Sequence, residues 1–119
     1  MPSVSVTFAP NSPQQIICNP DPIHVPYGSN QQVTWNLNGP NGAAFSSSGI
    51  SFKDQSAGTL LQVNDTQYQL TDDNTNTSGA DVDYPYSVNI VYNNQTYTLD
   101  PEVANDSGGG GRALRYRSA

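Results

Sequence analysis

Residues 86–99 read YSVNIVYNNQTYTL and contain two strand-like runs on either side of a turn. Asn93 and Asn94 lie between the runs, and asparagine tolerates the positive φ that a type I′ hairpin turn requires at both central positions. Tyr97 and Leu99 give the second run the same period of two. Large apolar residues occupy alternate positions of the first run: Tyr86, Val88, Ile90 and Tyr92. The stretch therefore predicts a β-hairpin with one buried face.

The same period of two recurs along the rest of the chain, with turn residues between the runs. Pro20 and Pro22 predict a stiff corner, because each proline fixes its own φ and restricts the residue before it. Asn64 and Asp65 predict a second hairpin turn. The apolar positions of these runs are Val4, Val6, Phe8, Ile16, Cys18, Ile23, Val25, Val33, Trp35, Leu37, Phe45, Ile50, Phe52, Leu61, Val63, Tyr68 and Leu70. The pattern predicts an all-β, antiparallel sandwich of seven to nine strands.

Length and composition limit the protein to a few classes. The 119 residues suit one domain, and charged residues make up only 12% of them. No apolar run approaches the roughly 18 residues of a membrane-spanning helix. The single cysteine excludes a disulfide scaffold, and 10 glycines with 9 prolines exclude a helical bundle.

Charge divides the chain into two parts. Residues 1–106 contain all 10 acidic residues and a single basic residue, Lys53. Residues 107–119 begin with a Gly-rich linker, continue as a basic peptide and contain no acid. We expect a sandwich over 1–106 and a flexible tail over 107–119. The acidic body should repel nucleic acid, so a protein or a second copy of the chain is the expected partner.

The pattern resembles the immunoglobulin-like superfamily over residues 3–99. Cys18 is similar to the core residue of strand B, and Trp35 is similar to the core tryptophan of strand C. Tyr86 and Val88 are similar to the start of strand F, with valine where antibody domains have the second cysteine, so this resemblance implies no inter-sheet disulfide. The abundance of asparagine also resembles that of small single-domain bacterial proteins. This sandwich serves many unrelated roles, so the resemblance implies a fold and no function.

Residues able to carry catalysis are few. The chain has one histidine, His24, and one cysteine, Cys18. His24 should face solvent, because it alternates with Ile23 and Val25, whereas Cys18 should be a buried, unreactive thiol. We therefore expect no catalytic residues and no enzymatic activity. No secretory signal is visible, so the default expectation is a cytoplasmic protein.

Two ligand sites are alternatives on the same sandwich. The polar stretch Thr71 to Asp83 predicts an acidic loop whose oxygens could hold a weak calcium ion, which prefers six to eight oxygen ligands. Its carboxylates are Asp72, Asp73, Asp81 and Asp83. Tyr27 and Tyr84 fall in expected loops, where tyrosine could stack on a carbohydrate. No other cofactor is expected.

The basic tail is the most distinctive functional feature of the sequence. Its arginines would pair with carboxylates, and its two large apolar side chains would fill small pockets. The residues expected to bind a partner are Arg112, Leu114, Arg115, Tyr116 and Arg117. We expect a non-enzymatic binding or structural module, with homomeric assembly through this tail. An unstructured end is the alternative for this segment, and calcium or carbohydrate binding is the alternative for the module.

Overall fold

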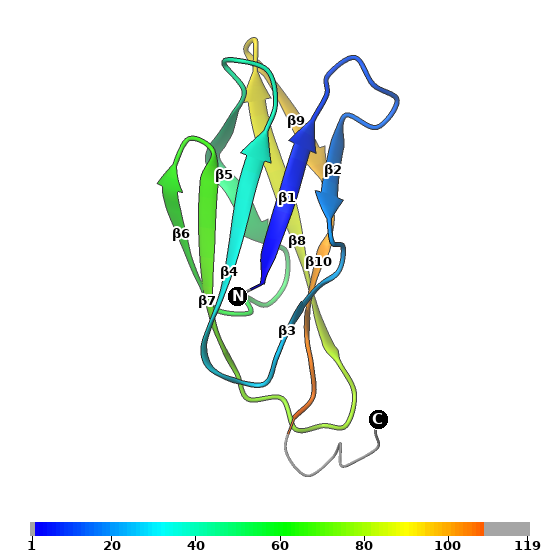
Figure 1. Ribbon diagram of the computed structural model, residues 1–119, viewed down its shortest axis with the longest axis vertical. Helices are drawn as coiled ribbons and strands as arrows, with labels where there is room; N and C mark the ends of the chain where they lie inside the picture. The colour runs from blue at the N-terminus through cyan, green and yellow to red at the C-terminus, as the bar shows by residue number, and fades with distance from the viewer. Residues whose placement is uncertain (1, 109–119) are drawn as a thin grey trace.

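The computed structural model describes residues 2–108, and these form two β-sheets packed face to face (Figure 1). The expected all-β architecture is confirmed. The first sheet has the order β2-β1-β4-β7-β6. Its strands are β1 (Ser3–Phe8), β2 (Ile16–Asn19), β4 (Gly28–Asn38), β6 (Thr59–Asn64) and β7 (Gln67–Asn74).

The second sheet has the order β3-β10-β8-β5, with β9 also paired to β8. Strand β9 pairs with the later half of β8 and β10 with its earlier half, so β9 and β10 follow one another along the same edge of β8. Pro101 lies in the break between them. The strands of this sheet are β3 (Ile23–Val25), β5 (Ala44–Phe52), β8 (Val82–Tyr92), β9 (Gln95–Leu99) and β10 (Glu102–Asn105).

The core lies between the sheets and is built from alternate residues of each strand. Trp35 of β4 is fully buried, and its Nε1 donates a hydrogen bond to the Tyr86 hydroxyl of β8 at 2.9 Å. The two rings meet edge to face, with centroids 5.4 Å apart. This contact joins the sheets at their centre and satisfies the buried indole N–H.

The prolines at residues 20 and 22 move the chain from one sheet to the other. Strand β2 pairs with β1 in the first sheet, and β3, which follows the corner, pairs with β10 in the second. Both Asn19–Pro20 and Asp21–Pro22 peptide bonds are cis. The expected corner is therefore present, and it brings His24 beside the C-terminal strand.

The expectation of purely antiparallel sheets is wrong. Strand β1 pairs parallel to β4, and β3 pairs parallel to β10. The cause is the chain direction: β2 and β3 run one after the other in the same direction, so β4 returns in the direction of β1. Similarly β10 continues the direction of β9 after the break at Pro101, and this is also the direction of β3 (Figure 1).

The structure corrects the length of the polar loop and the number of strands. Strand β7 continues to Asn74 and β8 begins at Val82, so the loop spans 75–81 rather than 71–83. Strand β10 was not expected, and residues 2–108 therefore contain ten strands. The overlong loop and the missing tenth strand have the same cause. The C-terminal ends of β7 and β10 bury polar residues, and hydropathy patterning assigns polar residues to loops.

In strand β6 the residue that faces the core is one position earlier than expected. Leu60 packs against the core, whereas Leu61 and Val63 are 60% and 44% exposed. The hairpin to β7 is present, but its turn is Asp65 and Thr66 and not the expected Asn64 and Asp65, because Asn64 still pairs with Gln67 of β7. The Asn93–Asn94 turn is confirmed, since both residues have positive φ, of 50° and 61°.

The strand positions that the immunoglobulin resemblance implies for Cys18 and Trp35 cannot both hold. Strands B and C of an immunoglobulin domain belong to opposite sheets. Cys18 and Trp35 lie in the same sheet, on β2 and β4, with β1 between them. Cys18 is buried as expected, and this burial raises the pKa of its thiol to about 12. Within residues 2–108 no helix has the length and apolar character needed to span a membrane.

Candidate functional site

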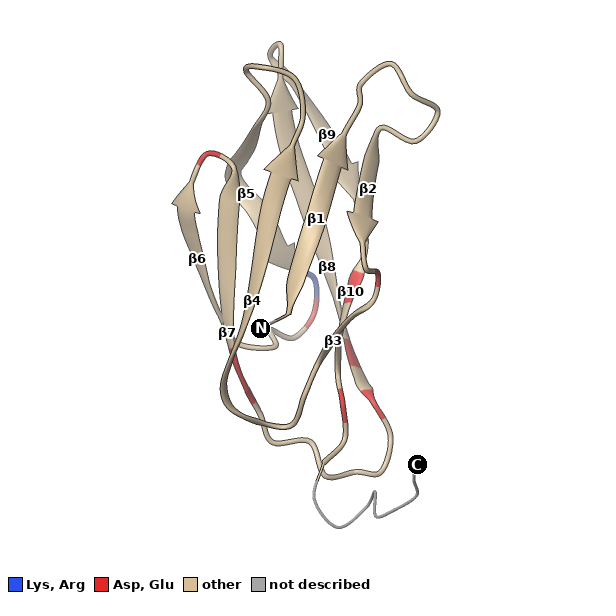
Figure 2. Ribbon diagram, viewed as in Figure 1, with Lys and Arg blue, Asp and Glu red and all other residues tan. Residues whose placement is uncertain are grey.

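Acidic residues are concentrated in the half of the sandwich from which the C-terminal segment leaves. Figure 2 shows them gathered there, with one further acidic position at the β6–β7 turn. Lys53 is the one basic residue among the first 108, and its Nζ lies 3.0 Å from Asp100 Oδ1. The other carboxylates of this half therefore have no lysine or arginine partner within the described chain.

We call His24 and the four carboxylates of Asp73, Asp81, Asp83 and Asp106 the acidic end. These residues come from β3, the end of β7, the 75–81 loop, the start of β8 and the segment after β10. The parallel pairing of β3 with β10 sets His24 opposite Ala104, two residues before Asp106. Segments far apart in the sequence thus meet at this end because of sheet pairing.

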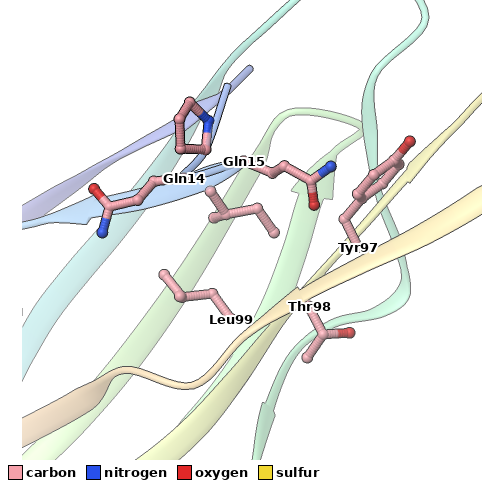
Figure 3. A pocket seen from close by; sticks show the side chains of 7 residues that line it. Gln14, Gln15, Tyr97, Thr98 and Leu99 are labelled. Carbon is pink, nitrogen blue, oxygen red and sulfur yellow. The ribbon is translucent and has the colours of Figure 1, made fainter. Parts of the chain in front are cut away.

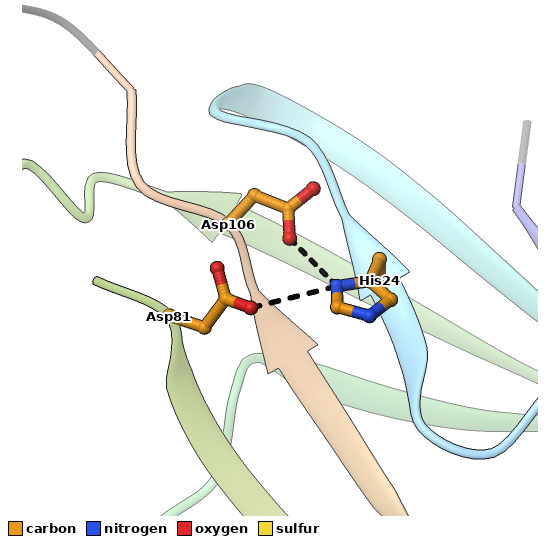
Figure 4. Close-up of side chains that lie close together, drawn as sticks. All are labelled: His24, Asp81 and Asp106. Atoms are coloured by element: carbon orange, nitrogen blue, oxygen red, sulfur yellow. Dashed lines mark hydrogen bonds and ion pairs between the residues drawn. The ribbon is translucent and has the colours of Figure 1, made fainter. Parts of the chain in front are cut away.

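His24, Asp81 and Asp106 form the closest group of the acidic end (Figure 4). His24 Nδ1 lies 2.8 Å from Asp106 Oδ1 and 3.8 Å from Asp81 Oδ2. Because an ionised carboxylate only accepts hydrogen bonds, this contact requires the N–H on Nδ1, which donates a hydrogen bond to Asp106 Oδ1. The side chains of His24, Asp81 and Asp106 are 53%, 46% and 34% exposed, so solutes can reach all three.

Two asparagines hold the backbone around this group. Asn74 is buried, and its Nδ2 donates to the carbonyls of Val25 and Asp106, both at 2.9 Å. Asn74 Oδ1 accepts from the backbone N–H of Asn76 at 2.9 Å. Asn76 Nδ2 in turn donates to the carbonyls of Ala80 and Asn105, at 2.8 and 3.0 Å. The positions of His24, Asp81 and Asp106 are therefore set by hydrogen bonds to the residues beside them.

The same network fixes the last described residues. Asp106 N–H donates to Val25 O at 2.9 Å, and Gly108 N–H donates to Asn76 O at 2.8 Å. Gly108 lies so close to Tyr27 that a Cβ atom there would be 2.2 Å from the tyrosine side chain. Only glycine fits this approach. The chain therefore leaves the sandwich from a defined point within the acidic end.

Asp72 is a buried carboxylate between the two sheets. Its side chain is inaccessible to solvent, and its Oδ1 accepts a hydrogen bond from Asn105 Nδ2 at 3.2 Å. Burial raises the pKa of Asp72 to about 6, with a smaller contribution from the negative charge of Asp73, while the Asn105 hydrogen bond lowers it. Asp72 thus belongs to the interior and not to the exposed group of carboxylates.

The structure does not bring the four expected calcium ligands together. Asp72 is buried on β7, and Asp73 Oδ1 accepts the backbone N–H of Asn30 at 2.6 Å. Asp83 is exposed on β8, opposite Ala104. Three metal-ligating side chains (His, Cys, Asp or Glu) come together at one place within residues 2–108. These are His24, Asp81 and Asp106, whose donor atoms lie within 4.8 Å of one another.

The two tyrosines expected in loops differ in their surroundings. Tyr27 lies in a bend between β3 and β4 and is 47% exposed. Tyr84 lies on β8 and not in a loop; it is half-buried, with its ring edge to face with Phe52 at 6.5 Å. The tail residues Arg112, Leu114, Arg115, Tyr116 and Arg117 lie outside the described residues.

A shallow cavity of about 240 Å³ lies near the opposite end, between β9 and the segment leading into β2 (Figure 3). Its walls are apolar, amide and hydroxyl side chains, with the Tyr97 phenol as their one titratable group. That phenol donates to Gln95 Oε1 at 2.8 Å. The lining residues are Pro13, Gln14, Gln15, Ile16, Tyr97, Thr98 and Leu99.

Sequence patterns did not find the His24–Asp106 contact. The two residues are 82 positions apart, and no local motif links them. The signal that existed was weak: a solvent-facing histidine on a short strand and an acidic residue just before the glycines. No protein-family model matches the chain, and comparison with curated proteins also finds no match.

Proposed function

We propose that this protein is a non-enzymatic binding or structural module whose acidic end binds the arginine-bearing segment 112–117 of a second copy. The separation of charge carries the proposal. The carboxylates of the acidic end lie in the same half of the sandwich as Gly108, whose N–H donates to Asn76 O in the 75–81 loop, and three arginines follow Gly108 within nine residues. Opposite charges at the two sides of an interface guide association and fix its orientation.

The chemistry of the acidic end suits such a segment. Guanidinium groups bind carboxylates through paired hydrogen bonds, and Asp81, Asp83 and Asp73 are all exposed. Two apolar side chains lie at the same end: Tyr27 is 47% exposed and Val82 is 37% exposed. Leu114 and Tyr116 of the tail supply the matching apolar groups. If two copies exchange tails around a two-fold axis, each interface forms twice in the dimer.

The sandwich supporting this site is proposed to be immunoglobulin-like. The order β4-β7-β6, facing β10-β8-β5, corresponds to strands B-E-D facing G-F-C of the constant-type domain, whereas β1 takes the place of strand A but runs parallel to β4. In this correspondence Trp35 belongs to strand B and Tyr86 to strand F. The strand order supports the proposal independently of the sequence resemblance, which had placed Trp35 on strand C.

Light scattering after gel filtration tests the assembly. The full chain should be a dimer or larger at about 0.05 M salt and should dissociate toward about 0.5 M, where charge interactions are screened. The combined variant Arg112→Gln, Arg115→Gln and Arg117→Gln should be a monomer at both salt concentrations. Lys53→Gln is the matched control, because it removes a positive charge outside the tail, and it should assemble like the parent.

A monomeric full chain at low salt would refute assembly through the tail. An equal mass for the parent and the triple arginine variant would refute it as well. A synthetic peptide of residues 109–119, titrated into the triple variant, then measures docking directly. Binding that Asp81→Asn weakens supports the acidic end as the receiving surface, whereas binding unchanged by this substitution contradicts it.

A further inference from the structure

His24, Asp81 and Asp106 have the donor atoms of a transition-metal site. We infer that these three side chains bind one divalent cation of the zinc class, with water completing the coordination. The ion takes the place of the proton on His24 Nδ1, and the bound neutral imidazole carries its proton on Nε2. The inference is separate from the proposed docking of the tail, because it requires a different ligand and a smaller set of residues. The group combines one imidazole nitrogen with two carboxylates, contributed by three segments of the chain (Figure 4).

The distances fit a small tetrahedral ion. Zinc binds nitrogen and carboxylate oxygen at about 2.0–2.2 Å, which places neighbouring donor atoms about 3.3–3.5 Å apart. The two measured separations from His24 Nδ1, 2.8 Å to Asp106 and 3.8 Å to Asp81, lie on either side of this value. The separation between the Asp81 and Asp106 oxygens is at most 4.8 Å, so small side-chain movements would bring the three atoms to binding distance. All three side chains are partly exposed and have room to make them.

The donor set selects the metal. Calcium and magnesium prefer coordination by oxygen alone, and calcium takes six to eight such ligands. Imidazole with carboxylate suits zinc, and by the same chemistry cobalt and nickel. Two carboxylates also balance the double positive charge of the ion, and Lys53, the one basic residue of the first 108, is paired with Asp100 instead.

The surrounding hydrogen bonds support the ligands in the way that outer partners orient a metal site. Asn74 Nδ2 donates to the carbonyl of Val25, the residue after His24, and to the backbone carbonyl of Asp106 itself. Asn76 Nδ2 holds the carbonyl of Ala80, the residue before Asp81. Residues 109–119 contain no His, Cys, Asp or Glu side chain, so the tail adds no competing ligand of this kind.

Calorimetry of the full, metal-free chain with zinc chloride at about pH 7.5 tests the site. We expect one zinc ion per chain, with calcium and magnesium at least tenfold weaker. His24→Gln and Asp81→Asn should each weaken zinc binding at least tenfold. Asp83→Asn is the matched control: it removes the same charge from an exposed carboxylate two residues away, and it should change the affinity by less than about twofold.

Cobalt substitution gives a second, spectroscopic measurement. The parent should show the visible absorption bands of a tetrahedral nitrogen–oxygen site without a thiolate charge-transfer band, and His24→Gln should lack these bands. Melting curves in chelator verify that each variant is folded, which is expected because these side chains are exposed. The inference is overturned if Asp81→Asn and Asp83→Asn weaken zinc binding equally, or if His24→Gln leaves zinc binding unchanged. Either result indicates that the negative surface attracts cations without a specific site. Repeating the light scattering in chelator distinguishes this outcome from failure of tail-mediated assembly.

Discussion

Asp72 and Asn105 form a hydrogen-bonded pair between the two sheets, with Asn105 Nδ2 donating to Asp72 Oδ1 at 3.2 Å. Both side chains are buried, and each leaves one oxygen without a hydrogen-bond partner among the described residues: Asp72 Oδ2, the second carboxylate oxygen, and Asn105 Oδ1, the amide oxygen. A neutral Asp72 can donate its O–H to Asn105 Oδ1 and satisfy both oxygens at once. An ionised Asp72 cannot, so the protonated acid is the form that this interior accommodates best.

The first prediction concerns the pH dependence of stability. The pKa of Asp72 is raised to about 6 in the folded protein, above its ordinary value near 3.8. The folded state therefore holds this proton more tightly than the unfolded state. Its contribution to the free energy of unfolding is complete below about pH 4 and is lost as the pH rises through about 6, on the order of 2 kcal/mol by pH 7.5.

Asp72→Asn should abolish this dependence. An asparagine can donate to Asn105 Oδ1 without a charge, so the variant should be more stable than the parent at pH 7.5 by about 2 kcal/mol. Urea unfolding between about pH 5 and 7.5 measures the difference. Asp54→Asn, an exposed carboxylate, is the control for overall charge and should retain the dependence on pH. If the free energy of unfolding of Asp72→Asn changes with pH as it does in the parent, the hydrogen-bonded pair of protonated Asp72 and Asn105 is contradicted.

The second prediction concerns the asparagine that orders the acidic end. Asn74→Ala removes two hydrogen bonds to backbone carbonyls and one from a backbone N–H. Because Asn74 is buried, the groups left behind lose their partners without gaining water, and we expect a cost of about 2–4 kcal/mol in unfolding free energy. Asn41→Ala, at an exposed turn, should cost less than about 0.5 kcal/mol.

Hydrogen exchange identifies where the Asn74 substitution acts. The amides of Asp106 and Gly108, which donate to Val25 and Asn76, should exchange faster in Asn74→Ala, whereas amides at the centre of β8 should change only with global stability. Uniform loss of protection would mean that Asn74 stabilises the sandwich as a whole and does not specifically order the C-terminal segment.

The third prediction concerns the reactivity of Cys18. Its pKa of about 12, raised by burial and then by the negative charge of Asp21, leaves on the order of one thiol in 10,000 ionised at pH 8. The native protein should therefore react with a thiol reagent such as Ellman's reagent far more slowly than the same protein in denaturant. Modification of the native chain as rapid as that of the unfolded chain would show that β2 opens freely from the sheet.

The strands were predictable because their signals are local. Period-two alternation around Trp35 and Ile90 marks a half-buried strand wherever it occurs, and Asn93 with Asn94 specifies its turn through backbone sterics. The corner formed by Pro20 and Pro22 was visible for the same reason. These features depend on neighbouring residues alone, so reading them requires no knowledge of the partner strands.

Only the tertiary structure decided which polar residues are buried and which charges meet. Hydropathy assigns Asp72 and Asn105 to solvent, yet both are buried, because Asn105 Nδ2 donates a hydrogen bond to Asp72 Oδ1 across the sheets. His24 meets Asp106 because β3 and β10 pair in parallel, which depends on chain direction through the whole sandwich. The sequence by itself thus determined most of the strands, β10 excepted, and the separation of charge between body and tail. Strand pairing determined the acidic end, because that site joins residues with no local relation.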